Sequence, residues 1–145
     1  MNDDELEGLA SRYRDILRQA VFLVRSIDAE GELSTSQVSI LNMVTGEPLR
    51  VGVIARNAGI RVPSATEQII KLEGAALVER IADESDARVV LVRLTDTGRE
   101  TLSRANARRN AIMARGLKTL EPAEIDAIDA VIPAIAKLNQ ALASS

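Results

Sequence analysis

The sequence predicts a mainly α-helical protein that carries one small β-hairpin. Two long stretches, one near each end of the chain, place apolar residues at alternating steps of three and four, which is the spacing of one helix face. Shorter segments with helical spacing lie between them, separated by Gly and Pro. Two runs rich in β-branched residues, 77–81 and 88–94, then follow each other across a polar loop, as the strands of a hairpin do.

The composition excludes several classes of site. The 145 residues include no Cys and no His, so the common zinc sites and the Ser-His or Cys-His nucleophile pairs cannot be built. The length fits a single domain over residues 1–145. The acidic N-terminus does not resemble a secretory signal, and no apolar run is long enough to cross a membrane. We therefore expect a cytoplasmic protein that is not an enzyme and has no cofactor, metal site or membrane partner.

The first and last predicted helices each carry an apolar stripe of heptad type. A single stripe of this kind most often packs into the protein's own core. Two long stripes at opposite ends of a small chain instead favour a helical dimer interface. We predict helices over 6–27 and 125–142 and assign dimerisation to Leu6, Leu9, Tyr13, Ile16, Ile128, Ile132, Ile135 and Leu142.

Three shorter helices are expected between residues 34 and 75. Ser34 and Gln37 have the spacing of a capping box and start the first. The second covers 51–58 and ends at Gly59. The third has Pro63 in its first turn and runs to about residue 75. Its inner face is drawn from Ala65, Ile69 and Leu72.

The segment "IARNAGI" predicts a helix-turn-helix. Two helices that cross through a short turn need a small residue at the crossing and usually a glycine in the turn, where φ is positive. Ala55 and Gly59 supply both, four residues apart. Such a pair also occurs in ordinary helical corners, so it does not decide the matter by itself.

The hairpin that follows strengthens this interpretation. The order helix, short turn, helix, hairpin is that of a winged helix, in which the second helix enters the major groove of DNA. The hairpin tip then reaches the minor groove, whose negative potential attracts arginine. We predict that Arg88 is the minor-groove probe and that Asp86 positions its guanidinium. The alternative is a solvated turn whose charges pair weakly. Thr95 and Asp96 start the next helix, expected to end near residue 120.

These segments resemble the MarR family of bacterial transcription regulators. The resemblance is carried by "DESDAR" (with Asp83, Asp86 and Arg88), by "VVLVRLTDTGRE" and by "PSATEQIIKLEGAALVER", and it extends over the whole chain. It implies a winged-helix homodimer on a pseudo-palindromic operator, usually a repressor that small, often aromatic ligands release. The sequence departs from the family pattern at Glu67, Gln68, Ala76 and Val89.

The polar face of the third short helix supplies the candidate base and phosphate contacts. Gln68 can pair with adenine, and Glu67, where the family often has a basic residue, can accept from cytosine N4. Ser64 and Thr66 suit phosphates or base edges, and Lys71 and Arg61 suit phosphates. A polar face in contact only with solvent is the alternative for all six residues.

The resemblance also divides the chain into lobes. It implies a winged-helix DNA-binding lobe over 34–100 and a helical dimerisation lobe made of 5–30 and 101–145. A ligand pocket between them would be lined by Tyr13, Leu17, Phe22, Met43 and Met113. The rival hypothesis is a winged-helix module that binds another protein and has no operator. It is favoured by Glu67 and by the nearly balanced charge of residues 61–110, which hold nine basic and eight acidic residues.

Overall fold

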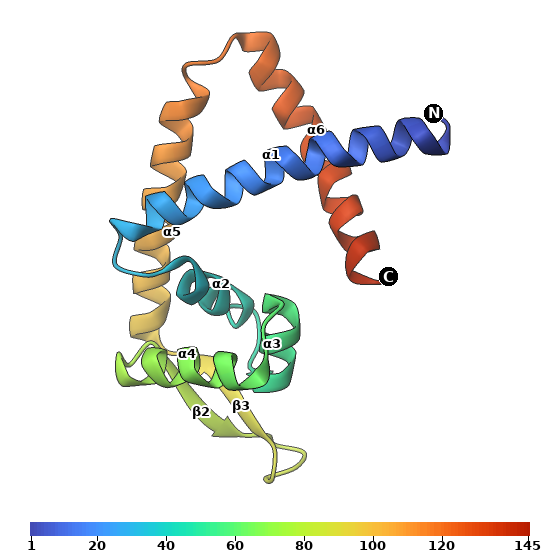
Figure 1. The fold of residues 1–145 in the computed structure, drawn as a ribbon. Coiled ribbons are helices and arrows are strands. Elements are labelled where there is room, and N and C mark those ends of the chain that lie inside the picture. Colours follow the sequence, from blue (N-terminus) through green and yellow to red (C-terminus); the bar gives the residue numbers. More distant parts are fainter. The chain divides into compact units, whose positions relative to one another are not determined.

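The structure, a computed structural model, describes all 145 residues and contains six helices and three short strands (Figure 1). The chain divides into two compact units, Met1–Ala107 and Arg108–Ser145. None of its helices could span a membrane. In chain order the elements are α1 (Asp3–Ala29), α2 (Thr35–Met43), β1 (Leu49–Arg50), α3 (Val51–Ala58), α4 (Val62–Gly74), β2 (Val78–Ala82), β3 (Val90–Leu94), α5 (Asp96–Leu117) and α6 (Pro122–Ala143).

Helix α1 is long, well capped and mostly exposed. The side chain of Asn2 accepts a hydrogen bond from the Glu5 backbone N–H, and the Glu5 carboxylate accepts one from the Asn2 backbone N–H, which completes a capping box. Acidic residues fill the first turn, where they favour the positive end of the helix dipole. Only Asp28 is buried. The predicted apolar stripe is therefore present on α1 but is not absorbed by the core of the first unit.

The core of the first unit lies among α2, α3, α4 and the sheet. Its largest fully buried side chains include Leu41 of α2, Ile54 of α3, Ile69 of α4 and Val92 of β3. The predicted capping box of α2 is confirmed, with Ser34 accepting from the Gln37 backbone at 3.2 Å and Gln37 accepting from the Ser34 backbone at 2.9 Å. This packing makes α2, α3 and α4 a support for the sheet.

The sheet has three antiparallel strands in the order β1-β3-β2. The hairpin pairs Val78 with Leu94 and Ala82 with Val90 at its two ends. Strand β1 pairs Leu49 with Val92 and was not predicted, because two residues are too few to show an alternating pattern.

The loop of the hairpin is longer than predicted. The sequence predicts that Arg88 and Val89 belong to the second strand, but the structure places them in the loop. The Arg88 backbone N–H donates to the Asp86 carboxylate, and the Val89 backbone N–H donates to the Asp86 carbonyl. Groups engaged in these turn bonds cannot join the strand ladder.

The start of α5 is joined tightly to the turn after α4. The Thr95 hydroxyl donates to the Ala76 carbonyl at 2.6 Å and accepts from the Gly98 backbone at 2.9 Å. A Cβ on Gly98 would lie 1.9 Å from the Leu77 carbonyl oxygen. The predicted capping role of Thr95 is therefore confirmed. Position 98 requires glycine, because any side chain there would collide with the Leu77 carbonyl.

The second unit consists of the end of α5 and all of α6. Helix α5 ends at Leu117, slightly before the predicted end. Glu121 and Glu124 form a capping box at the start of α6. Helix α6 has no buried residue, although it carries the predicted apolar stripe.

Candidate nucleic-acid interface

Helices α3 and α4 form the predicted helix-turn-helix. Gly59 ends α3 in the left-handed region, with φ of 66°. The Ile60 N–H donates to the Ala55 carbonyl at 3.0 Å and the Gly59 N–H to the Arg56 carbonyl at 3.2 Å, which is the Schellman arrangement. Ala55 is buried where the helices approach. Both residues that predicted the motif therefore act as expected.

The two faces of α4 differ sharply. Ala65, Ile69 and Leu72 are fully buried, as predicted. Among the candidate contact residues, Arg61 sits at the N-cap. Arg61, Ser64, Glu67 and Lys71 are exposed, whereas Thr66 and Gln68 are half-buried.

Glu67 is not an isolated negative charge on α4. Its Oε1 lies 3.8 Å from the Nζ of Lys71, one turn further along the helix. Exposed ion pairs of this kind are weak. This ion pair therefore fixes neither side chain firmly in place.

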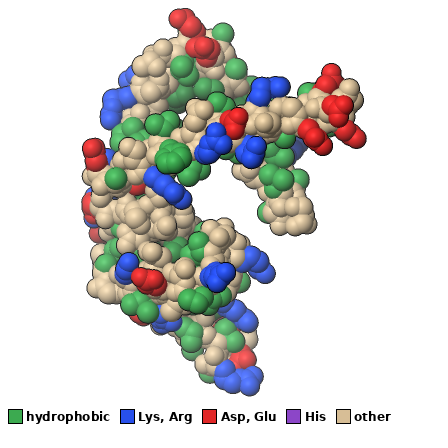
Figure 2. All heavy atoms as spheres, in the orientation of Figure 1, with side chains coloured by type: hydrophobic (Ala, Val, Ile, Leu, Met, Phe, Trp, Pro, Cys, Tyr) green, Lys and Arg blue, Asp and Glu red, His purple; other side chains and the backbone are tan.

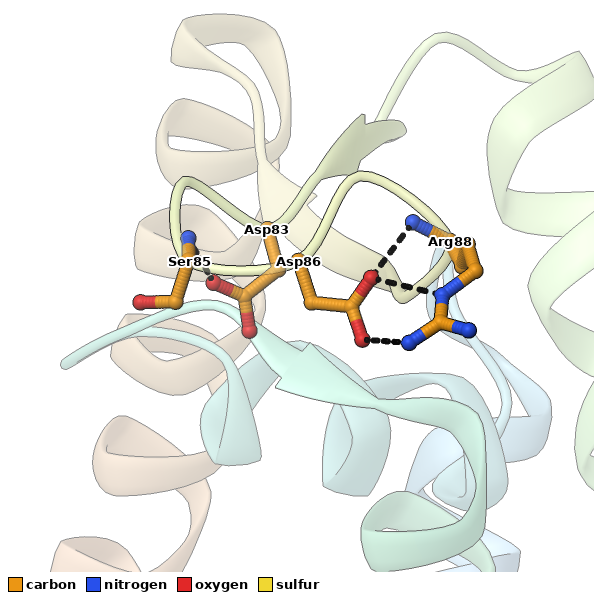
Figure 3. A network of polar contacts seen from close by, with 4 residues as sticks. All are labelled: Asp83, Ser85, Asp86 and Arg88. Atoms are coloured by element: carbon orange, nitrogen blue, oxygen red, sulfur yellow. Dashed lines mark hydrogen bonds and ion pairs between the residues drawn. The ribbon is translucent and has the colours of Figure 1, made fainter.

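The wing tip holds Arg88 through Asp86 (Figure 3). The guanidinium Nε and Nη2 donate to the two carboxylate oxygens of Asp86, each at 3.1 Å. The Arg88 backbone N–H also donates to Oδ1, at 3.1 Å. The Arg88 side chain is nevertheless 90% exposed, and basic and acidic side-chain atoms lie next to each other at the end of the wing (Figure 2). The predicted pairing of Asp86 with Arg88 is thus confirmed, and the arginine is both positioned and accessible.

These contacts change the ionisation of both groups. Hydrogen bonds from the Arg88 side chain, followed by that from its backbone, hold the pKa of the Asp86 carboxyl below its usual value, with a smaller contribution from the charge of Arg50. The Asp86 carboxylate in turn raises the pKa of Arg88. Asp83 shapes the other side of the loop by accepting from the Ser85 backbone at 2.9 Å.

Arg50 is a basic residue near the wing that the sequence did not single out. It is exposed and lies in β1, opposite Leu91 of β3. Its charge acts on Asp86, although 36 positions separate them in the chain. Only the pairing of β1 with β3 brings it there, so no local pattern could have revealed it.

Ion pairs link β2 to α4 and link the two strands of the hairpin to each other. Arg80 of β2 lies 3.3 Å from Glu73 near the end of α4. Within the hairpin, Arg93 of β3 pairs with Glu79 of β2, its partner in register. Helix α4 and strand β2 are therefore joined by an ion pair as well as by the chain that connects them.

A further ion pair joins α5 to the segment before α2. Arg104 donates to both carboxylate oxygens of Glu32, each at 3.1 Å. This pairing lowers the pKa of Glu32 and raises that of Arg104, mainly through the hydrogen bonds. It joins α5 to the turn between α1 and α2.

The five predicted pocket residues lie on several elements. Tyr13, Leu17 and Phe22 are on α1, Met43 ends α2, and Met113 is in the second unit. Leu17, Phe22 and Met113 are exposed, and Met43 packs partly against the core. The Tyr13 hydroxyl is buried and has no hydrogen-bond partner. The pocket itself stays a prediction, as does the division into lobes.

The geometry of the first unit agrees with comparisons to known proteins. A sequence model of the MarR family matches residues 18–90, which include α2, the helix-turn-helix and the wing loop. The chain belongs to the MarR family. TcaR of Staphylococcus aureus (strain Newman), an HTH-type transcriptional regulator, is 27% identical over 106 residues, which are 72% of this chain and 70% of TcaR.

Solved structures extend the similarity of fold to the whole chain. The transcriptional regulator BldR from Sulfolobus solfataricus matches with a TM-score of 0.76 and 26% identity over 100% of both chains. CouR from Rhodococcus jostii RHA1, crystallised with p-coumaroyl-CoA, matches with a TM-score of 0.70 over 97% of this chain and 92% of CouR, at 23% identity. This MarR-family protein is therefore a winged-helix, DNA-binding transcriptional regulator and not an enzyme.

Proposed function

We propose that the protein is a homodimeric repressor that binds a pseudo-palindromic operator. The observation that carries operator binding is the wing tip, where Asp86 holds an exposed Arg88 guanidinium (Figure 3). The loop that contains both residues extends beyond the ends of β2 and β3 (Figure 1). A pre-positioned arginine loses less conformational entropy on binding than a free one does. It therefore suits insertion into a narrow minor groove.

Helix α4 is the proposed major-groove element. Its buried face anchors it to the lobe, and its outer face offers Ser64, Glu67 and Lys71, with Gln68 at the edge. Glu67 would accept from a cytosine amino group and Gln68 would pair with adenine. Arg61 and Lys71 would contact phosphates, as would Ser64 or Thr66 where they do not meet base edges.

The apolar surfaces of the terminal helices support the homodimer. Ile16 on α1 is 61% exposed and Ile132 on α6 is 56% exposed. Each helix repeats such residues along one stripe, and large exposed apolar stripes mark interaction surfaces. A dimer with twofold symmetry would place two copies of α4 on two half-sites of a palindrome.

Release by a small molecule is part of the proposal. The Tyr13 hydroxyl is a buried donor without a partner. A hydrogen bond to a polar ligand atom would satisfy this group and so favour ligand binding. CouR, which shares the fold, was crystallised with p-coumaroyl-CoA. An apolar or aromatic ligand with one polar atom near Tyr13 would fit these observations.

Operator binding can be tested directly with the purified full-length protein. We would measure fluorescence anisotropy with the duplex upstream of its own gene and with a scrambled duplex, at two salt concentrations. Preference for the natural duplex, with affinity that falls as salt rises, would support operator binding. Equal weak binding to this pair and to a set of genomic fragments would contradict it and favour the protein-interaction module.

A further inference from the structure

Helix α4 exposes an apolar row that is distinct from its polar contact residues. Val62 is 50% exposed and Ile70 is 55% exposed, with the half-buried Thr66 midway between them. Residues spaced by four form a ridge along a helix. Each of these three β-branched side chains bears methyl groups, so we call this row the methyl ridge. Figure 2 shows hydrophobic side chains at the surface of this part of the lobe.

The methyl ridge is not part of the core. The core face of α4 is already occupied by Ala65, Ile69 and Leu72. Around the helix, Ile70 lies between Glu67, which is exposed, and Glu73, which pairs with Arg80 of the wing. The ridge therefore runs along the side of α4 between its charged outer surface and the wing. Contact with another apolar group would remove part of the Ile70 side chain from water, which is favourable.

Duplex DNA offers one apolar group in the major groove, the C5-methyl group of thymine. The chain is a DNA-binding MarR-family regulator, and the second helix of a helix-turn-helix enters that groove. We propose that the methyl ridge recognises thymine methyl groups in the operator, with Ile70 as the principal specificity-determining residue. This proposal rests on the proposed operator binding. It adds recognition through methyl groups to the hydrogen bonds expected from Glu67 and Gln68.

Replacement of thymidine by deoxyuridine tests this contact, because it removes only the C5-methyl group. We would first select duplexes that bind the full-length protein from a pool of random sequence. Each thymidine of a selected half-site would then be replaced in turn and the affinity measured by anisotropy. Burial of one methyl group corresponds to about a fourfold change in affinity. We expect a loss of about that size at one or two positions of the half-site and none at the others.

The Ile70→Ala variant identifies the residue that contacts each methyl group. It should bind the thymidine duplex more weakly and should lose the deoxyuridine penalty at its own position. Val90→Ala is the matched control, because Val90 is an exposed apolar residue of the same lobe that lies on β3. It should keep the full penalty. Thr66→Ser, which removes one methyl group and keeps the hydroxyl, tests the middle of the ridge. Circular dichroism melts would verify that each variant is folded.

The outcomes separate this proposal from the one on which it depends. Absence of any deoxyuridine penalty, or an unchanged penalty in Ile70→Ala, would overturn recognition by the methyl ridge while operator binding stands. If Ile70→Ala leaves DNA affinity unchanged, a protein partner becomes the better explanation for the exposed ridge. A random pool from which no sequence is enriched would contradict operator binding itself, and the methyl ridge proposal with it.

Discussion

At the scale of single residues, Asp86 holds the Arg88 side chain in position while leaving it exposed. The guanidinium makes two hydrogen bonds to one carboxylate and still exposes most of its surface. Both partners belong to one short loop, so the sequence was sufficient to predict the pair. What the sequence could not show is the added charge of Arg50, which reaches Asp86 only through strand pairing.

Arg88→Ala should weaken operator binding by roughly tenfold and reduce the salt dependence by about one counterion. The reason is the loss of one positioned positive charge from the minor groove. Anisotropy titrations at several salt concentrations would measure both quantities. Arg18→Ala is the control, since Arg18 is an exposed arginine of α1. Equal affinity and slope in Arg88→Ala and the natural protein would contradict the minor-groove assignment.

The Asp86–Arg88 contact should also depend on pH. The folded-state pKa of Asp86 lies below its ordinary value of 3.8. Its stabilising contribution is therefore complete above the ordinary value and is lost as pH falls through the lowered folded-state pKa. An NMR titration of the Asp86 carboxyl should give a midpoint below 3.8, and Arg88→Ala should move that midpoint upwards. A midpoint that Arg88→Ala leaves in place would show that the pairing does not hold the carboxylate in solution.

At the scale of elements, the turn after α4 determines how the recognition helix meets the wing. Helix α4 ends in a Schellman motif, with the Leu77 N–H bonded to the Leu72 carbonyl at 2.9 Å. Ala76 takes the left-handed position of this motif, with φ of 61°. Ala76 is one of the positions at which the sequence departs from the pattern of the family that it resembles. The structure shows why alanine is unusual at this position: a residue with a side chain is strained at positive φ.

Ala76→Gly should stabilise the protein by about 0.5–1 kcal/mol. It relieves the left-handed strain of about 1–2 kcal/mol and costs part of that gain in backbone entropy. Ala75→Gly is the matched control, because Ala75 has ordinary negative φ. That change should instead destabilise by about 0.5–1 kcal/mol. Urea unfolding would measure both, and a destabilised Ala76→Gly would show that positive φ is not strained there.

Gly98→Ala should destabilise the protein by about 3 kcal/mol, at the upper end of the usual cost of overpacking. The new methyl group would overlap the Leu77 carbonyl, and backbone on both sides would have to move. Gly52→Ala provides the opposite control. Gly52 lies on α3, and a Cβ added there would meet nothing within 4 Å. This change should stabilise by less than about 1 kcal/mol, the value for a helix interior, because Gly52 lies in the first turn of α3. Thermal melts would rank the two, and equal melting temperatures would show that α5 does not approach the turn so closely.

At the scale of the whole molecule, the chain leaves many large apolar side chains exposed on its terminal helices. The first unit closes its own core among α2, α3, α4 and the sheet. Helix α6 buries none of its residues. This exposed apolar surface supports the proposed homodimer, since matching heptad stripes can pair as helices of a bundle.

Ile132→Glu on α6 and Ile16→Glu on α1 should each shift the protein from dimer to monomer. A buried charge without a partner strongly opposes association. Size-exclusion chromatography with light scattering should give twice the chain mass of 15.6 kDa for the natural protein and the single mass for each variant. Ser11→Glu, on α1 but outside the stripe, is the control and should stay dimeric. A monomeric natural protein at micromolar concentration would contradict the assignment of both helices.

The sequence by itself determined the elements whose signals are local. These are the helix periodicity, the Ser34 capping box, Gly59 in its turn and the Asp86–Arg88 pair. Each depends on residues a few positions apart, so a short stretch of sequence contains the whole pattern. The tertiary structure decided what depends on distant segments. It placed β1 beside β3, brought Arg50 to Asp86 and Glu73 to Arg80, and pressed Gly98 against Leu77. Such contacts follow from how the elements pack, and no short stretch of sequence contains both partners.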